Sequence, residues 1–187
     1  MIDPDFPLLD ATGRGDLDAF ESLVKRYQRP LLNFIARYLG DRSAAEDLTQ
    51  EVFLRIYRAA PRFEAKAKVS TWVFRIAYHL VLTELGRRSR QQNLRESLRR
   101  SREEGSEEAL TDPLERYELE EEILSALGRL PGNQRAALLL RINEELSYAE
   151  IGEVLGVGVQ SVESLLFRAR KNLRESLGRR KKQGEPK

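Results

Sequence analysis

One predicted helix near the C-terminus carries polar, aromatic and basic side chains at a spacing that suits the reading of DNA bases. With about 100° between successive residues, five side chains fall on one side of it: Gln160, Glu163, Ser164, Phe167 and Lys171. In a helix-turn-helix, the outward face of the second helix contacts base edges in the major groove, and later basic residues contact phosphates. The spacing therefore predicts a DNA-reading helix.

The residues before this helix supply the element that would position it. Ser147 and Glu150 form a capping-box pattern, and Gly156 suits a left-handed helix end before a tight turn. Apolar residues would pack both helices on a core: Ile151, Val154 and Leu155 in the first, and Val162, Leu166, Ala169 and Leu173 in the second. A pair of solvated helices in an ordinary bundle is the alternative reading.

Composition excludes several classes of protein. The 187 residues are 41% hydrophobic, enough for packed cores, and the net charge is only +2, so affinity for nucleic acid must come from local clusters of charge. Residues 87–102 contain seven arginines and one acid, and residues 168–187 are basic again. Without cysteine there is no disulfide framework, thiolate nucleophile or cysteine-based zinc site.

Targeting signals are also missing from the sequence. The first residues lack a basic leader followed by an apolar core, and no window approaches the roughly 20 apolar residues of a membrane span. We therefore expect a cytoplasmic protein with no membrane insertion of its own.

Helix signals recur along the chain, and strand signals are nearly absent. A first long helix would follow Asp16 and reach Gly40, with Pro30 interrupting it or beginning its continuation. Further helices are expected from Ser43 to Pro61, from Thr71 to about Leu85, and near 113–129, 133–143, 147–155 and 159–177. Residues 89–111 are rich in Arg, Glu, Ser and Gln and would form a flexible tether. The predicted fold is all-α: two helical domains joined by a flexible charged linker, the second containing the helix-turn-helix.

Two stretches of the chain, in this order and spacing, carry a resemblance to a known family. In the first domain these residues are 45–54 (AEDLTQEVFL) and 70–77 (STWVFRIA). In the second they are Leu130, Pro131, Arg135, Ser147, Tyr148, Glu150, Ile151, Leu155, Gly156, Ser161, Val162 and residues 167–170. Together they resemble the extracytoplasmic-function, or group IV, sigma factors of bacterial RNA polymerase. The resemblance implies sigma region 2 in residues 1–90, a linker in 91–111 and sigma region 4 in 112–187.

For the first domain, the resemblance implies a contact with core RNA polymerase. Four residues form a stripe opposite the inner residues Leu48, Val52 and Ile56: Asp47, Gln50, Glu51 and Leu54. An acidic stripe with Gln suits a basic partner helix, here the clamp helices of the beta-prime subunit. A merely solvated helix face is the alternative.

The same domain is implied to bind the promoter's minus-10 element and to hold an unpaired strand there. The candidate residues are Phe63, Lys66, Lys68, Arg75, Tyr78, His79, Thr83 and Arg87. A loop at residues 63–69 could pocket a flipped base and so offset its unstacking. Trp72 is expected to be a core anchor more than a stacking platform. Tyr78, His79, Thr83 and Gly86 depart from residues common in the family, which leaves the base preference open.

The second domain is implied to read the minus-35 element. Its candidate residues are Gln160, Ser161, Glu163, Ser164, Phe167, Arg168, Arg170 and Lys171. Glutamate can accept a hydrogen bond from cytosine N4 and phenylalanine can pack on a thymine methyl. The residues expected to read bases are Glu163, Ser164, Phe167 and Arg168. Those better placed for phosphates are Arg170, Lys171 and Arg174. Glu163 and Leu165 stand where many relatives have basic residues.

No arrangement of residues suggests catalysis, and neither a cofactor nor a metal is expected. His79 has no second ligand nearby, and the acids at 118–122 have the pattern of a solvated helix face. The expected function is a promoter-specificity subunit that binds core polymerase and promoter DNA and helps to open the minus-10 element. The resemblance adds a cognate anti-sigma factor. A helix-turn-helix regulator that works without polymerase and a module that binds only proteins are the alternatives.

Overall fold

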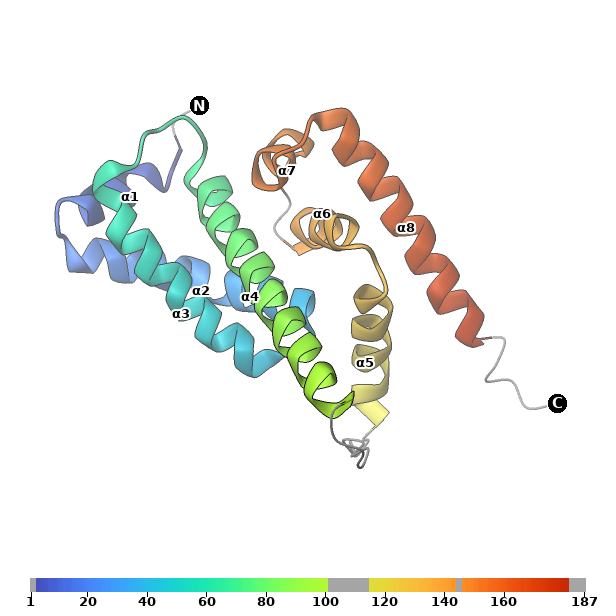
Figure 1. Ribbon diagram of the computed structural model, residues 1–187. Helices are drawn as coiled ribbons and strands as arrows, with labels where there is room; N and C mark the ends of the chain where they lie inside the picture. Colours follow the sequence, from blue (N-terminus) through green and yellow to red (C-terminus); the bar gives the residue numbers. More distant parts are fainter. Residues whose placement is uncertain (1–2, 101–114, 144–145, 182–187) are drawn as a thin grey trace.

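The computed structural model describes residues 3–100, 115–143 and 146–181, and each regular element in these ranges is a helix (Figure 1). The first half contains α1 (Phe6–Gly13), α2 (Leu17–Leu39), α3 (Arg42–Ala59), the short 3-10 helix η1 (Ala60–Arg62) and α4 (Val69–Arg100). The second half contains α5 (Glu115–Gly128), α6 (Gly132–Asn143), α7 (Tyr148–Leu155) and α8 (Val159–Lys181). The all-α prediction is confirmed, and α1 is a helix that the sequence patterns did not predict.

Helix α2 runs unbroken across Pro30, from a cap at Asp16 to Gly40. The Asp16 carboxylate accepts a hydrogen bond from the Ala19 amide at 3.0 Å, and Gly40 has φ 66°, the left-handed conformation that glycine adopts without strain. The buried residues of this helix include Leu23, Leu31, Phe34, Ile35 and Tyr38. Their spacing presents one apolar face to α1, α3 and α4.

Helix α3 begins two residues earlier than predicted. Asp41, not Ser43, caps it, since its carboxylate accepts from the Ala44 amide at 3.0 Å. Asp41 also pairs with Arg88 at 2.8 Å, so a partner 47 residues away stabilises this cap over the Ser43 alternative. At the other end the helix stops at Ala59, and Pro61 lies within η1.

Helix α4 contradicts the predicted extent of the linker, because it continues to Arg100 where a flexible tether was expected from residue 89. Arginine, glutamine, leucine and glutamate are strong helix formers and dominate this stretch. Pairs one turn apart add to this preference, with Gln92 donating to Glu96 at 3.2 Å and Arg88 to Glu84 at 2.7 Å. Residues 101–111 of the predicted linker lie outside the described residues.

The helix-turn-helix has the predicted local structure. Both capping-box bonds are present, with the Glu150 amide donating to the Ser147 hydroxyl at 3.3 Å and the Ser147 amide donating to the Glu150 carboxylate at 2.7 Å. Gly156 has φ 70°. The turn is so tight that a Cβ at Gly152 would lie 2.6 Å from the Val157 carbonyl oxygen, which explains a glycine inside α7.

The two halves pack against each other in one closed arrangement. Helix α4 contacts α7, and α2 contacts α5 and α6, so that α5–α7 stand between the first half and α8 (Figure 1). The buried core runs through both halves, from Phe34 and Phe74 to Leu138, Ile151 and Leu166. The outer position of α8 leaves one of its faces toward solvent.

Candidate nucleic-acid interface

A cationic cavity of about 600 Å³ lies where α3, η1 and the start of α4 meet. Its lining residues are Arg55, Arg58, Ala59, Arg62, Phe63, Glu64, Lys66, Ala67, Trp72, Arg75 and Ile76. Phe63 and Trp72 pack with ring centroids 5.0 Å apart and an interplanar angle of 60°. Phe63 and Trp72 are half-buried. Basic side chains beside aromatic rings suit a single nucleic-acid strand, whose phosphates and bases they can contact together.

Three arginines of this cavity were not among the predicted site residues: Arg55, Arg58 and Arg62. They come from the last turns of α3 and from η1, whereas the prediction considered only the loop and α4. A signal was available, since positions 55, 58 and 62 have the i, i+3, i+7 spacing of one helix face. Of the predicted residues, the structure brings Phe63, Lys66 and Arg75 to the cavity, and Lys66 pairs there with Glu64.

Three predicted minus-10 residues contact the second half of the chain. Lys68 forms an ion pair with Glu150 of α7 at 2.6 Å, and Arg75 donates to the Glu153 carbonyl oxygen at 3.0 Å. The Tyr78 hydroxyl donates to the Asn133 side chain at 2.8 Å, and Tyr78 is only 4% exposed. In the closed arrangement these three side chains are therefore bonded to residues of α6 and α7.

The ion pair between Lys68 and Glu150 changes the titration of both groups. Partial burial by itself raises the pKa of Glu150. Hydrogen bonds from Lys68 and Ser147 outweigh this effect and lower the pKa to about 2. The hydrogen bond to Glu150 raises the pKa of Lys68. Both groups are therefore charged near neutral pH, and they form an ion pair between the halves.

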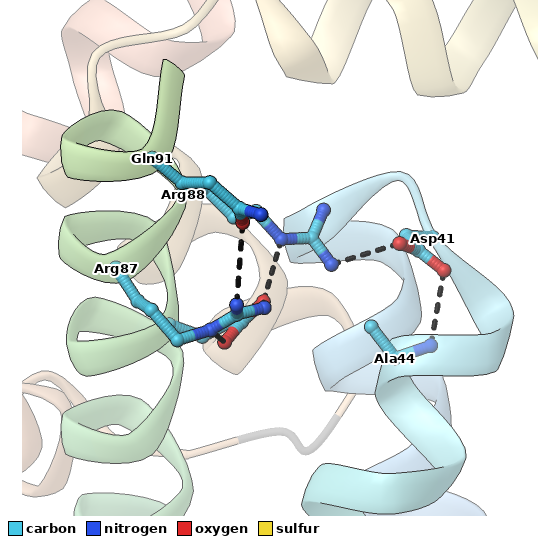
Figure 2. A network of polar contacts seen from close by, with 6 residues as sticks. Asp41, Ala44, Arg87, Arg88 and Gln91 are labelled. Carbon is cyan, nitrogen blue, oxygen red and sulfur yellow. Dashed lines mark hydrogen bonds and ion pairs between the residues drawn. The ribbon is translucent and has the colours of Figure 1, made fainter. Parts of the chain in front are cut away.

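The remaining predicted residues on α4 point to solvent or to one another. His79 and Thr83 are exposed, and the Thr83 hydroxyl donates to the His79 carbonyl at 2.9 Å. Arg87 donates to the Glu84 carboxylate at 2.8 Å, and Arg88 bridges from Glu84 to Asp41 (Figure 2). Hydrogen bonds from Arg87 and Arg88 lower the pKa of Glu84 to about 2. This network joins α4 to the start of α3.

A second contact between the halves centres on Arg135 of α6. Its guanidinium lies 5.2 Å from the ring centroid of Tyr38 and donates to the Tyr38 carbonyl at 2.7 Å. Burial raises the pKa of Tyr38 to about 12 and lowers that of Arg135. A cation stacked on an aromatic ring in a desolvated site is held more strongly than at the surface.

The predicted polymerase-binding residues share the outward face of α3. Asp47, Gln50 and Leu54 are exposed, and Leu54 has 49% of its surface accessible. Glu51 is half-buried and accepts from Arg55 at 2.8 Å. The opposite face is formed by Ala45, Thr49, Val52, Phe53 and Ile56, all buried.

The outward face of α8 contains the predicted minus-35 residues, and all eight are exposed: Gln160, Ser161, Glu163, Ser164, Phe167, Arg168, Arg170 and Lys171. Phe167 is 70% exposed, a large apolar side chain without cover. Val162, Leu166 and Ala169 are buried on the other side, as predicted. Leu173 is half-buried.

Two further observations concern metals and membranes. Within the described ranges, no three His, Cys, Asp or Glu side chains gather where they could hold a metal ion. Nor does any helix in the described part of the chain combine the length and apolar character needed to cross a bilayer.

Comparisons with known proteins match both halves. The family described as Sigma-70 region 2 matches residues 23–91, and Sigma-70 region 4 matches residues 120–173. The RNA polymerase sigma-H factor of Pseudomonas aeruginosa is 34% identical, over 92% of this chain and 93% of its own length. The ECF RNA polymerase sigma factor SigW of Bacillus subtilis is 32% identical, over 88% and 91%. CnrH, solved in complex with the cytosolic domain of CnrY, is 26% identical with a TM-score of 0.69, over 93% of this chain and 97% of that one.

Two helical regions, one with a cationic cavity and one with a helix-turn-helix, match the two sigma-70 families and define a sigma-type transcription initiation factor. The chain belongs to the extracytoplasmic-function sigma factors of bacterial RNA polymerase. It is an alternative sigma factor that directs transcription initiation, and the reading as a regulator independent of polymerase is not favoured.

Proposed function

We propose that the two regions divide promoter recognition between them. Residues 1–90 would act as region 2, binding core polymerase and the minus-10 element, and residues 112–187 as region 4, binding the minus-35 element. The family matches at residues 23–91 and 120–173 support this division. The observation that carries the proposal is the cationic cavity beside Phe63 and Trp72, since an unpaired base needs both an aromatic surface and cations.

The minus-10 strand would enter this cavity from the side of the arginines. Arg55, Arg58 and Arg62 would contact its phosphates, and Phe63 would lie against a flipped base. The other predicted residues of the loop and of α4 would contact the same element: Lys66, Lys68, Arg75, Tyr78, His79, Thr83 and Arg87. Because Lys68, Arg75 and Tyr78 are bound to α6 and α7 in the closed arrangement, the halves must separate before these three side chains reach DNA.

The minus-35 duplex would receive α8 in its major groove. The residues of this face are exposed in the closed arrangement, and α8 lies on the far side of α5–α7 from the first half (Figure 1), so this helix is accessible whether or not the halves are packed together. Six residues would face bases: Gln160, Ser161, Glu163, Ser164, Phe167 and Arg168. Two basic residues, Arg170 and Lys171, would face phosphates. Opening would therefore change minus-10 binding more than minus-35 binding.

The outward face of α3 would dock on the clamp helices of the polymerase beta-prime subunit. Leu54 is the apolar member of this face; Gln50 and Glu51 lie about one turn before it and Asp47 about two. A large apolar side chain among polar neighbours is a common anchor at protein interfaces.

The proposal includes an anti-sigma factor as a third partner. CnrH has been solved with the cytosolic domain of CnrY, and the present chain has an apolar cavity of about 630 Å³ at the junction of its halves, lined by residues such as Ala36, Leu124, Leu127 and Ile142. A partner that binds across this junction would favour the closed arrangement. The chain itself would act by binding alone, in the cytoplasm, without catalysis.

Run-off transcription with core polymerase on genomic fragments, followed by sequencing of the transcripts, tests the proposal. We expect promoter-dependent initiation with the wild-type chain. We expect Leu54→Ala to weaken core binding by about 1–2 kcal/mol, the cost typical of an interface anchor. Leu17→Ala, which removes a 65% exposed leucine of α2, is the matched control and should have no effect. Initiation that never depends on this chain would refute the proposal.

A further inference from the structure

The first described residues of the chain form a short arm that reaches the cationic cavity. This arm, residues 3–6, is anchored on α2 through Asp5, which is only 7% exposed. The Asp5 carboxylate accepts a hydrogen bond from the Tyr27 hydroxyl and pairs with Arg26. A buried carboxylate with two such partners holds its backbone in place, because breaking either contact would leave a desolvated charge.

The arm makes its first link to the cavity at the start of α4. The Val69 amide, the first of that helix, donates to the Asp3 carboxylate at 2.5 Å, and the Asp5 amide donates to the same carboxylate at 3.0 Å. The first amides of a helix lack partners within it and favour a negative charge nearby. Asp3 thus caps α4 from a position 66 residues earlier in the chain, directly beside the loop at residues 63–69.

The second link is a chain of aromatic rings. Phe6 packs on Phe63 with centroids 6.3 Å apart, and Phe63 packs on Trp72 at 5.0 Å. Phe63 and Trp72 line the cavity, whereas Phe6 contacts Phe63 without lining it. Removing Phe6 would therefore take away one of the two aromatic rings that pack on Phe63.

The charge of Asp3 points to a structural role at this place. The cavity beside it is lined by four arginines, one lysine and a single glutamate, as expected for a surface that attracts a polyanion. An additional acid would weaken that attraction, yet both oxygens of Asp3 are used by backbone amides. Asp3 therefore contributes by fixing the loop.

We infer that residues 3–6 are a positioning arm, which holds Phe63 and the start of α4 in the geometry that receives an unpaired base. The arm lies before residues 23–91, the range that matches the Sigma-70 region 2 family. The inference rests on the proposed function of the cavity. Asp3 and Phe6 are positioning residues, which act on the strand site through Val69 and Phe63 without touching DNA themselves.

Two readouts test the arm in the full-length chain. Trp72 is the only tryptophan, so quenching of its fluorescence by acrylamide reports directly on the packing around Phe63. The second readout is the affinity of reconstituted holoenzyme for the single-stranded minus-10 segment of a promoter obtained by the transcript sequencing above. We expect Phe6→Ala to raise the quenching constant and to weaken strand binding about 2- to 10-fold, which corresponds to the loss of one aromatic pair.

Matched variants separate the arm from general effects. Phe6→Tyr should restore both readouts, and Leu17→Ala, at an exposed apolar position, should change neither. Asp3→Asn keeps the shape but weakens the cap, and we expect a smaller change in the same direction. Asp10→Asn is its control, because it removes the same charge from an exposed pair with Arg14. If Phe6→Ala does not fold, the comparison of these two asparagine variants carries the test.

Each outcome has a separate meaning. Unchanged Trp72 quenching in Phe6→Ala and Asp3→Asn would overturn the arm, even if strand binding fell. Increased quenching with unchanged strand affinity would refute the cavity as the strand site, and with it the role of the arm in base capture. Increased quenching together with weaker strand binding, and unchanged binding to core polymerase, supports the inference.

Discussion

The guanidinium of Arg135 stacks on Tyr38 and donates to the carbonyl oxygen of the same residue, so that α6 of the second half is tied to the end of α2 in the first. Around this contact the Tyr78 hydroxyl bonds to Asn133, and Lys68 pairs with Glu150. These polar contacts add to the apolar core that the two halves share. Changing them should shift the balance between closed and open chains.

Gly132 offers the most direct test of this closure. A Cβ at this position would lie 2.9 Å from the Tyr38 hydroxyl oxygen, and Tyr38 is only 1% exposed, so we expect Gly132→Ala to disfavour closure by about 1–3 kcal/mol. The chain has no native cysteine, so dyes can be placed on Leu17→Cys and Val159→Cys, both at exposed positions. Energy transfer between these dyes should fall.

Two variants control this experiment. Gly128→Ala adds the same methyl group in open space and should leave energy transfer unchanged. Tyr38→Phe removes the hydroxyl that the new methyl would meet, so it should rescue Gly132→Ala. Equal transfer in Gly132→Ala and Gly128→Ala would contradict the importance of this contact.

Asp41 should contribute to stability through two separable interactions (Figure 2). Its carboxylate caps α3 at Ala44 and pairs with Arg88, and these hydrogen bonds lower its pKa. We expect Asp41→Ala to lower the free energy of unfolding by about 1–2 kcal/mol. Asp41→Asn keeps a capping oxygen and should cost less. Urea unfolding measures both, and an equal loss in the two variants would contradict a separate contribution from the cap.

The pair between Glu150 and Lys68 should make closure sensitive to acid. The pKa of Glu150 is about 2 in the folded chain, below its usual value of 4.5. Its stabilisation of the closed arrangement is therefore complete above pH 4.5 and is lost as the pH falls toward 2. In Glu150→Gln the energy transfer should already be lower at neutral pH and should change less between about pH 6 and pH 3. Glu153→Gln, an exposed neighbour, should keep the wild-type profile. A Glu150→Gln profile that overlays the wild type would exclude this pair.

On α8, Glu163 and Lys171 should affect DNA binding in different ways. Glu163→Ala should change the preferred base at one minus-35 position by about 1–3 kcal/mol, because a base contact is lost. Lys171→Ala should weaken all sequences alike and reduce the salt slope by about 1, as for a lost phosphate contact. Both side chains are exposed, so neither change should alter folding. A uniform loss across sequences in Glu163→Ala would exclude base reading by this residue.

Local spacing sufficed to predict the helix-turn-helix. Ser147, Glu150 and Gly156 act within one or two helical turns, and the buried stripe of Val162, Leu166 and Ala169 follows from the helical period alone. The same spacing rule, applied to positions 55, 58 and 62, would also have found the arginines of the cavity. These features could be read from sequence because the residues that interact are neighbours along the chain.

The sequence by itself thus determined an all-helical chain, the two faces of α8 and the outward stripe of α3. Only the tertiary structure decided that Asp41 caps α3, that Asp3 caps α4, and that Lys68, Arg75 and Tyr78 are occupied by the second half. Asp3 and Val69 are 66 residues apart, and Arg135 and Tyr38 are 97 apart. Helical periodicity defines which side chains share a face, but the partner of that face depends on how distant helices pack, which no local pattern specifies.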